Sequence, residues 1–355
     1  MIEHVATLKI AMMMVTIVRQ ENAMVKEAKE NVSLKRRTTK SIFNHFFWFT
    51  AVKKPREVYV PHEDEMFGTG ISAGINFDQF DKIEVKVSGD DTDVILPLER
   101  FESAGWKASL VRSIKRSGYK KPTPIQKYAI PLITANRDLM GCAQTGSGKT
   151  VAFVLPILNK ILTENCASPS NQPLCLIIAP TRELVIQIYE EICKFANESW
   201  VKVAFVYGDS PSTHRDVQLA KESHILVATP GRLMDYVGKS MITFESLKHF
   251  IIDNADKVVQ SGFKDLIGKI RSHATFNKEV CQTLMFSATF PDGIQRLAST
   301  YLQKHVYVAI GIVGRTPSDV DQQFIEVYKF KKDAKLIVSH SSSDVNVILI
   351  SSFLF

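Results

Sequence analysis

The sequence lacks any hydrophobic run long enough to cross a membrane. Its apolar segments "IAMMMVTIV" at 10–18 and "SIFNHFFWF" at 41–49 have nine residues each, whereas a membrane helix needs about 20. No convincing small-residue cleavage site follows the first segment, so a soluble intracellular protein is favoured over a secreted one. The sequence therefore predicts a protein with no membrane partner.

Cysteines are also few, and their number and spacing argue against two further classes of protein. The five thiols show no paired metal-ligand spacing, and an odd count suits a reducing compartment better than a disulfide-stapled domain. We expect them to be free and mostly buried, in a cytoplasmic protein. They are Cys142, Cys166, Cys175, Cys193 and Cys281.

The charge balance favours a polyanionic partner such as nucleic acid. The net charge is +7 and the pI is about 9.0, although many basic proteins bind no nucleic acid. Hydrophobic residues make up 45% and charged residues 23%, as in ordinary soluble globular proteins. The charge is therefore consistent with a nucleic-acid-binding protein but is not sufficient evidence for one.

The composition and the apolar pattern of the sequence predict four segments. Residues 1–60 form an irregular, charged flank, 61–100 an extension, and 101–315 the main domain, after which the strand pattern fades. The basic run at 35–37 could contact nucleic acid or act as a nuclear address, but a solvated charge cluster is the favoured interpretation. The 40 residues at 316–355 are too few to fold alone.

From about residue 100, short apolar runs alternate with helix-like segments. The runs include "LCLIIAP", "HILVATP", "HFIIDNA" and "TLMFSAT", and "RELVIQIYEEICKFA" is a typical amphipathic helix. Strands that are apolar on both faces and separated by such helices indicate an α/β fold, a parallel sheet with helices on both faces. Nearly every run ends in small polar residues, and ligands bind at the carboxyl ends of strands in open α/β sheets.

The segment "AQTGSGKT" at 143–150 predicts a phosphate-binding loop. Gly146 and Gly148 let backbone amides curl around an anion, Lys149 pairs with terminal phosphates, and the hydroxyl of Thr150 suits Mg²⁺. Ala143 stands where the general pattern has a glycine, so the glycine spacing is incomplete. The alternative is a flexible turn, which the Lys-Thr pair behind the strand-like "DLMGCA" disfavours.

The stretch "FIIDNADKVV" at 250–259 predicts the acidic partner of this loop. Asp253 follows an apolar run, so a buried strand end is favoured over a surface turn, and its carboxylate can hold Mg²⁺ through water. The next residue is Asn254, an amide that cannot take up a proton at neutral pH. Nucleotide binding with magnesium is therefore the predicted chemistry.

Five motifs in order, "AQTGSGKT", "PTREL", "TPGRL", "DNAD" and "SAT", resemble those of the DEAD-box RNA helicases. Ahead of them "GYKKPTPIQ" is similar to the family's Q motif, and "FGTGISAGINFDQFDKIEVKVSG" resembles its Vasa branch, the germline helicases. The resemblance covers roughly residues 60–333 and implies a RecA-like P-loop domain. It also implies a Vasa-like extension at 61–100, and at 316–355 a stub of a second RecA-like domain with an unrelated tail.

The resemblance implies ATP and Mg²⁺ as cofactors. Gln126 is expected to read the adenine edge and Phe101 to stack on the ring, while Lys149, Asp253 and Asn254 occupy the catalytic positions. Thr150 and Asp253 are the expected magnesium ligands, partly through water. The other implied nucleotide contacts are Ala143, Gln144, Thr145, Gly146, Ser147 and Gly148, and the residues implied to couple nucleotide state to domain closure are Asp256, Ser287, Ala288 and Thr289.

The resemblance also implies single-stranded or duplex RNA as a partner, contacted through its backbone and without sequence reading. Independently, Thr181 and Arg182 lie where a strand passes into a helix, and a helix N-terminus is a natural anion site. A surface salt bridge is the favoured interpretation for one arginine alone, but several at one edge favour RNA. The implied contacts are Thr181, Arg182, Gly208, Thr229, Gly231 and Arg232.

Three departures from the family pattern bear on activity. Asn254 replaces the glutamate that polarises the attacking water, a loss of about 10²–10⁴-fold in rate. Asp209 stands where the family has a second glycine. Most of the second RecA-like domain is expected to be absent, and with it an arginine finger worth roughly 10³–10⁵ in turnover.

Three hypotheses follow for the chain. It is a working ATP-dependent RNA helicase, a hydrolysis-impaired module that binds ATP, RNA or protein partners, or a truncated product without function. The sequence favours the second and third, and we expect little or no ATP turnover. The Vasa resemblance adds germ granules to the expected cytoplasmic location.

Overall fold

The computed structural model describes residues 67, 83–90, 95–165, 169–208 and 214–311. The chain divides into two compact units, Met1–Val60 and Pro61–Phe355, and every described residue belongs to the second. The predicted flank at 1–60 and the tail at 316–355 lie outside the described residues, as do Cys166 and Asp209. The four described cysteines are free, and three of them are buried.

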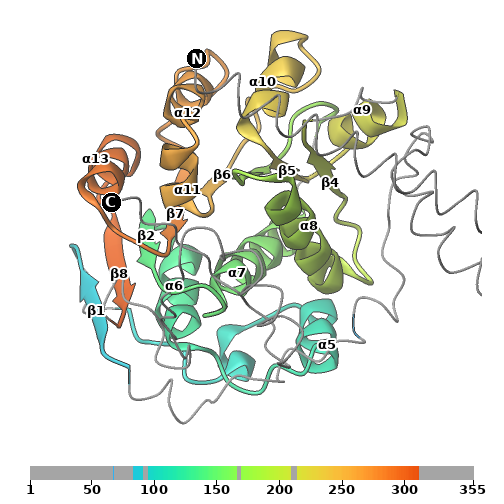
Figure 1. Cartoon of the computed structure of the whole chain (residues 1–355). Coiled ribbons are helices and arrows are strands. Elements are labelled where there is room, and N and C mark those ends of the chain that lie inside the picture. Colours follow the sequence, from blue (N-terminus) through green and yellow to red (C-terminus); the bar gives the residue numbers. More distant parts are fainter. Residues whose placement is uncertain (1–66, 68–82, 91–94, 166–168, 209–213, 312–355) are drawn as a thin grey trace, which may run out of the picture. The chain divides into compact units, whose positions relative to one another are not determined.

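An eight-stranded sheet forms the centre of this unit (Figure 1). Its strands are β1 (Val85–Ser88), β2 (Leu139–Cys142), β3 (Cys175–Ile178), β4 (Val203–Val206), β5 (Ile225–Ala228), β6 (His249–Ile252), β7 (Gln282–Ser287) and β8 (Val306–Ile310). They lie in the order β1-β8-β2-β7-β6-β3-β5-β4. All neighbours pair in parallel except β1 and β8, so the predicted parallel sheet is confirmed.

The antiparallel strand β1 was not predicted. It is four residues long, its side chains alternate between half-buried and exposed, and it covers the free side of β8 in register with Val85 opposite Ile310. The alternation of Ile83, Val85 and Val87 with polar residues is a local signal that could have indicated it. Its pairing with β8, more than 200 residues later, could be learned only from the tertiary structure.

Helices cover both faces of the sheet, as predicted. They are η2 (Phe101–Ala104), α5 (Ala108–Arg116), α6 (Pro124–Thr134), α7 (Lys149–Glu164), α8 (Arg182–Ala196), α9 (His214–Lys221), α10 (Pro230–Gly238), α11 (Ala255–Gln260), α12 (Lys264–Arg271) and α13 (Asp292–Tyr301). Helices α5–α8 lie on one face and α9–α13 on the other (Figure 1). None of the helices in the described ranges is both long and apolar enough to span a membrane.

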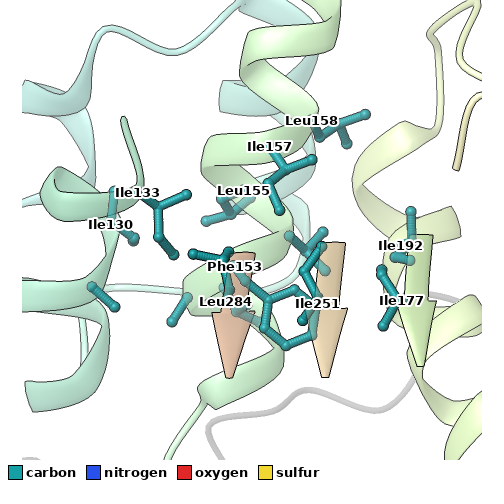
Figure 2. Close-up of a cluster of buried hydrophobic side chains, with 14 of the residues drawn as sticks. Ile130, Ile133, Phe153, Leu155, Ile157, Leu158, Ile177, Ile192, Ile251 and Leu284 are labelled. Carbon is teal, nitrogen blue, oxygen red and sulfur yellow. The ribbon is translucent and has the colours of Figure 1, made fainter. Parts of the chain in front are cut away.

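Two hydrophobic clusters, one on each face, hold the layers together. Along β3 and β6, Ile177 and Ile251 enter the cluster under α5–α8, whereas Ile178 and Ile252 enter the other. Figure 2 shows the first cluster, with Phe153 of α7 among the strand residues. Because side chains alternate along a strand, apolar residues at every position are explained by burial on both faces.

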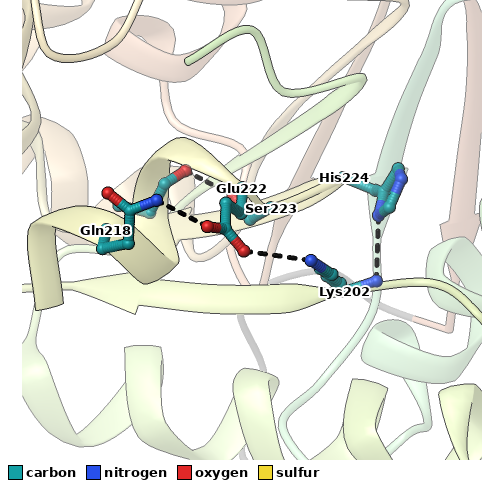
Figure 3. Close-up of polar contacts among 6 residues, drawn as sticks. Lys202, Gln218, Glu222, Ser223 and His224 are labelled. Carbon is teal, nitrogen blue, oxygen red and sulfur yellow. Dashed lines mark hydrogen bonds and ion pairs between the residues drawn. The ribbon is translucent and has the colours of Figure 1, made fainter. Parts of the chain in front are cut away.

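The start of the edge strand β4 is fixed by polar contacts with the turn before β5 (Figure 3). The carboxylate of Glu222 accepts hydrogen bonds from Lys202 Nζ at 3.0 Å and from Gln218 Nε2 at 2.5 Å. The backbone N–H of Lys202 donates to His224 Nδ1 at 2.9 Å, and burial lowers the pKa of this imidazole. These bonds fix the register of β4, whose other end contributes to the candidate site.

Candidate functional site

The carboxyl ends of six parallel strands form one edge of the sheet, here called the carboxyl edge. Short backbone hydrogen bonds keep the segments beyond the strands aligned. Ala143 N donates to Ser287 O at 3.1 Å, and Thr229 N donates to Val206 O at 3.0 Å. In the order β2, β7, β6, β3, β5, β4, the strand ends and the segments that follow them contain residues 143–150, 287–289, 253–256, 181–182, 229–232 and 208.

This order separates the predicted site residues into two groups. The ends of β2, β7 and β6 carry the predicted phosphate, magnesium and coupling residues, and those of β3, β5 and β4 carry the predicted RNA residues. The predicted base contacts Phe101 and Gln126 lie elsewhere, in η2 and α6. The sequence placed the residues of both groups at strand ends. Only the strand order shows that each group is contiguous and that the two groups meet between β6 and β3.

The glycines of the loop before α7 have conformations that other residues rarely adopt. Gly146 has a φ of 80° and Gly148 a φ of 87°, both in the left-handed region. A Cβ atom at Gly146 would meet nothing within 4 Å, so the loop is open there, while one at Gly148 would lie 2.4 Å from Gln126 Nε2. Ala143 is not among the residues with positive φ, so this position does not need the glycine of the general pattern.

The N-terminus of α6 holds two carbonyl groups of the loop. Thr123 Oγ1 donates to Ser147 O at 2.7 Å, and Gln126 Nε2 donates to Gly148 O at 3.1 Å. In a trans peptide the N–H of the next residue points the opposite way. The bonds therefore direct the amides of Gly148 and Lys149 away from α6, as a phosphate cradle requires.

Thr123 is a site residue that the sequence reasoning missed. It caps α6 in a reciprocal capping box with Gln126, whose Oε1 accepts from Thr123 N at 3.0 Å. The Thr-x-x-Gln spacing in "TPIQ" is the sequence signal of such a box. Gln126 is fully buried and both ends of its amide are bonded. The adenine contact expected of it stays a prediction and requires these bonds to be exchanged.

Phe101 lies in the core rather than at an open face. Its ring is 3% exposed and meets Tyr119 edge-on, with ring centroids 6.0 Å apart. The stacking on adenine that the family resemblance implies stays a prediction. It would require the ring to turn out of the hydrophobic cluster.

Lys149 and Asp253 form the charged centre of the nucleotide group. Lys149 Nζ donates to Ala143 O at 2.7 Å and to Gln144 O at 2.8 Å, folded back on its own loop. Burial lowers the pKa of Lys149 and raises that of Asp253 to about 6, while the attraction between the two charges opposes both shifts. The cost of burying the two charges thus outweighs their mutual attraction. A ligand that supplies compensating charge would stabilise the charged forms of both groups.

Two buried oxygen atoms at this centre have no hydrogen-bond partner among the described residues. They are Ser147 Oγ in the loop and Oδ1 of Asp253, a residue that is 4% exposed. Buried polar atoms are almost always bonded, and exceptions commonly mark a ligand or ion position. The pair, with Lys149 and the open side of Gly146, fits a bound anion accompanied by a cation.

The cation site has few protein ligands. Within the described ranges, no group of three or more His, Cys, Asp or Glu residues could hold a metal ion. Mg²⁺ is commonly bound by one or two carboxylates, with water and phosphate oxygens completing the octahedron. Asp253, with the hydroxyl of Thr150 at the start of α7, meets that limited requirement.

Asn254 begins α11 in the left-handed conformation, with φ 51° and ψ 53°. Asparagine is one of the few side chains that tolerate this region. Its Nδ2 is 3.4 Å from Asp253 Oδ2, so its amide donates toward the carboxylate. The residue is therefore compatible with its backbone position, but it offers no group that accepts a proton.

The predicted coupling residues are in contact. Asp256 Oδ2 accepts a hydrogen bond from Thr289 Oγ1 at 3.1 Å, which joins the segment after β6 to that after β7. Ser287 O accepts from Ala143 N, which joins the end of β7 to the phosphate loop. These two bonds link the phosphate loop, the end of β7 and the segment that contains Asp256, and the coupling role stays a prediction.

The predicted RNA residues surround the end of β4. Thr181 caps α8, its Oγ1 accepting from Leu184 N at 3.4 Å. The guanidinium carbon of Arg182 lies 4.8 Å from the ring centroid of Tyr207, and Arg232 Nε donates to Tyr207 O at 3.1 Å. Gly208 has open space where a Cβ would lie, and Thr229 and Gly231 are at the start of α10. Tyr207, which no sequence motif indicated, contacts both arginines.

Comparison with known proteins agrees with this geometry. Residues 123–297 match the DEAD/DEAH box helicase family. The chain is 44% identical to the ATP-dependent RNA helicase vasa of Drosophila melanogaster over 307 residues, 85% of this chain and 46% of that protein. It is a Vasa-like member of the DEAD-box helicase family. The probable ATP-dependent RNA helicase DDX4 of Homo sapiens is 43% identical over 80% of this chain and 40% of its own length.

Solved structures of DEAD-box proteins share the fold. The RNA helicase Prp28 from Chaetomium thermophilum, bound to ADP, superposes with a TM-score of 0.58 and 31% identity, over 82% of this chain and 66% of that one. A DEAD box protein from Methanococcus jannaschii gives a TM-score of 0.55 at 28% identity, over 69% of this chain and 64% of that one. This DEAD-box chain spans less than half the length of the curated relatives described above.

Proposed function

We propose that this DEAD-box domain binds ATP with Mg²⁺ at the β2–β7–β6 part of its carboxyl edge. The unpartnered oxygens of Ser147 and Asp253 beside Lys149 are the observation that carries the proposal. An ATP–magnesium complex supplies both the anion and the cation that these atoms lack. Membership of a family whose members are named ATP-dependent RNA helicases points to the same ligand.

Each residue of the site then has a defined task. The amides of Gly148 and Lys149 and the N-terminus of α7 hold phosphate oxygens, and Lys149 Nζ exchanges its loop carbonyls for the terminal phosphates. Asp253 and Thr150 hold Mg²⁺, which neutralises phosphate charge when bound. Gln126 orients the loop and reads the base once it releases Gly148.

We further propose that the β3–β5–β4 part of the edge binds the phosphate backbone of single-stranded or duplex RNA. Thr181, Arg182, Thr229 and Arg232 lie at helix starts or beside them, where amides and guanidinium groups suit phosphates. Contacts of this kind provide affinity but no base discrimination. The Asp256–Thr289 bond is the proposed link between the two ligands.

Hydrolysis by this chain is proposed to be slow. Phosphoryl transfer to water needs a group that orients the nucleophile and takes its proton. Asn254 stands at that position, and its amide donates toward Asp253. The rate of hydrolysis is expected to be about 10²–10⁴-fold lower than with a glutamate at this position. The chain is thus proposed to act mainly by holding ATP and RNA, in the cytoplasm and its germ granules, with protein partners.

Nucleotide titrations test the first part of the proposal. A fluorescent ATP analogue with Mg²⁺ should bind the full chain, and Lys149→Ala should weaken binding strongly. Lys160→Ala is the matched control, because Lys160 lies on the same helix and contacts Ile133 O rather than the loop. Equal binding by wild type and Lys149→Ala, or no binding by wild type, would overturn the proposal.

Turnover separates slow hydrolysis from the alternative of a working helicase. We expect no RNA-stimulated phosphate release above background from the full chain. Robust release that disappears in Lys149→Ala would establish the working helicase instead. RNA binding is tested by the anisotropy of a labelled oligonucleotide, where Arg232→Ala should weaken binding to different sequences by similar factors.

A further inference from the structure

Tyr207, the residue after the edge strand β4, lies at the meeting point of the two arginines proposed to bind RNA. Its ring faces the guanidinium of Arg182, with 4.8 Å between the guanidinium carbon and the ring centroid. Its carbonyl oxygen accepts a hydrogen bond from Arg232 Nε at 3.1 Å. Arg182 begins α8 after β3, and Arg232 lies in α10 after β5, so Tyr207 joins segments from three strands.

The ring of Tyr207 is supported by further aromatic side chains. It stacks on Phe205 of β4, with centroids 5.4 Å apart and planes 7° from parallel. Phe205 in turn meets Tyr189 of α8 edge-on at 4.6 Å, and Tyr189 is 4% exposed. These contacts run from Arg182 through Tyr207 and Phe205 to Tyr189, which lies two turns after Arg182 in the same helix, α8. Such a closed arrangement holds the Tyr207 ring in place.

The electrostatics of Tyr207 suit two neighbouring cations. The face of an aromatic ring is negative, and so is a carbonyl oxygen, so each arginine is attracted by a different part of the residue. Asp235 Oδ2 lies 3.8 Å from Arg232 Nη1 and adds a negative charge beside this guanidinium. The N–H groups of a guanidinium point outward in its own plane. They therefore stay free to donate to phosphate oxygens when the guanidinium stacks on an aromatic ring.

We propose that Tyr207 is a positioning residue for RNA-backbone binding, which sets the guanidinium groups of Arg182 and Arg232 before the RNA arrives. The inference rests on the proposed RNA binding and deepens it. Long side chains that are already ordered lose less conformational freedom when they bind. The ring faces Arg182, whereas Arg232 donates to the backbone carbonyl, and this difference makes the inference testable by substitution.

Binding of a fluorescently labelled oligouridine to the full chain is the readout. Tyr207→Phe keeps the ring face and should bind as tightly as wild type, whereas Tyr207→Leu keeps apolar bulk without the ring and should bind about 2- to 5-fold more weakly. In an Arg182→Ala background, Tyr207→Leu should have no further effect. In an Arg232→Ala background it should keep its full effect, because that contact does not involve the ring.

Equal binding by wild type and Tyr207→Leu, or the same loss in both arginine backgrounds, would overturn the inference while leaving RNA binding intact. Failure of the wild-type chain to bind the oligouridine would overturn the proposed RNA binding, and this inference with it. Urea unfolding midpoints check that each variant is folded. Tyr207→Met, a flexible apolar side chain, replaces Tyr207→Leu if that variant does not fold.

Discussion

The two glycines of the phosphate loop allow a matched test of how Gln126 supports it. Gly146→Ala and Gly148→Ala both place a Cβ on a backbone with φ between 80° and 87°. This conformation costs an alanine about 1 kcal/mol. At Gly146 the new atom meets nothing within 4 Å, so that cost is the whole expected loss of unfolding free energy.

At Gly148 the new Cβ would lie 2.4 Å from Gln126 Nε2, and the buried amide must move. It then loses its bonds to Gly148 O and to Thr123 N, each worth roughly 0.5–1.5 kcal/mol. Gly148→Ala should therefore reduce the unfolding free energy by about 1–3 kcal/mol more than Gly146→Ala does.

Urea unfolding measures this difference in a double-mutant cycle of Gly148→Ala and Gln126→Ala, with Gly146→Ala as the matched control. In a Gln126→Ala background the two bonds are already lost, so Gly148→Ala should cost about as little as Gly146→Ala, near 1 kcal/mol. Equal losses for the two glycine variants in the wild-type background would refute the reasoning. So would an excess at Gly148 that persists without Gln126.

Three further predictions concern stability and use the same unfolding assay. Asn254→Glu should cost about 1 kcal/mol because its φ is 51°, whereas Asn254→Gly should cost nothing from backbone strain, and equal losses would contradict this. Burial lowers the pKa of His249 to about 4 from 6.5, so the unfolded chain takes up the proton first and stability should fall by about 3 kcal/mol between pH 6.5 and 4. His249→Asn should flatten that fall, and an unchanged pH profile would exclude His249 as its source. Asp138→Ala should cost about 2–4 kcal/mol, because two backbone N–H groups bonded at 2.7 Å lose their acceptor, and a loss below 1 kcal/mol would argue against it.

Much of the fold could be predicted because its signal is local. Runs such as "LCLII" and "HFII" are apolar at nearly every position, as expected of a strand covered on both faces. The amphipathic segment at 182–196 was predicted with the bounds that α8 has. Strand β1 gave no such run, because its side chains alternate between half-buried and exposed, and its partner strand lies far along the chain.

The site divides in the same way. The loop glycines, Lys149 and Asp253 could be recognised because their chemistry depends on residue type and on position after a strand. Tyr207 could not, because its contacts join segments that follow three different strands. The burial of Phe101 likewise depends on packing against Tyr119, which the sequence does not display.

The sequence by itself determined the α/β class, the phosphate loop, the acidic strand end and the amide at Asn254, because each is a property of one short segment. The tertiary structure decided which of these segments are neighbours. Parallel strands are joined by crossovers, so neighbours in the sheet need not be neighbours in the chain. The unpartnered oxygens, the bonds of Gln126 and the two arginines on Tyr207 exist only because the sheet brings distant strand ends together.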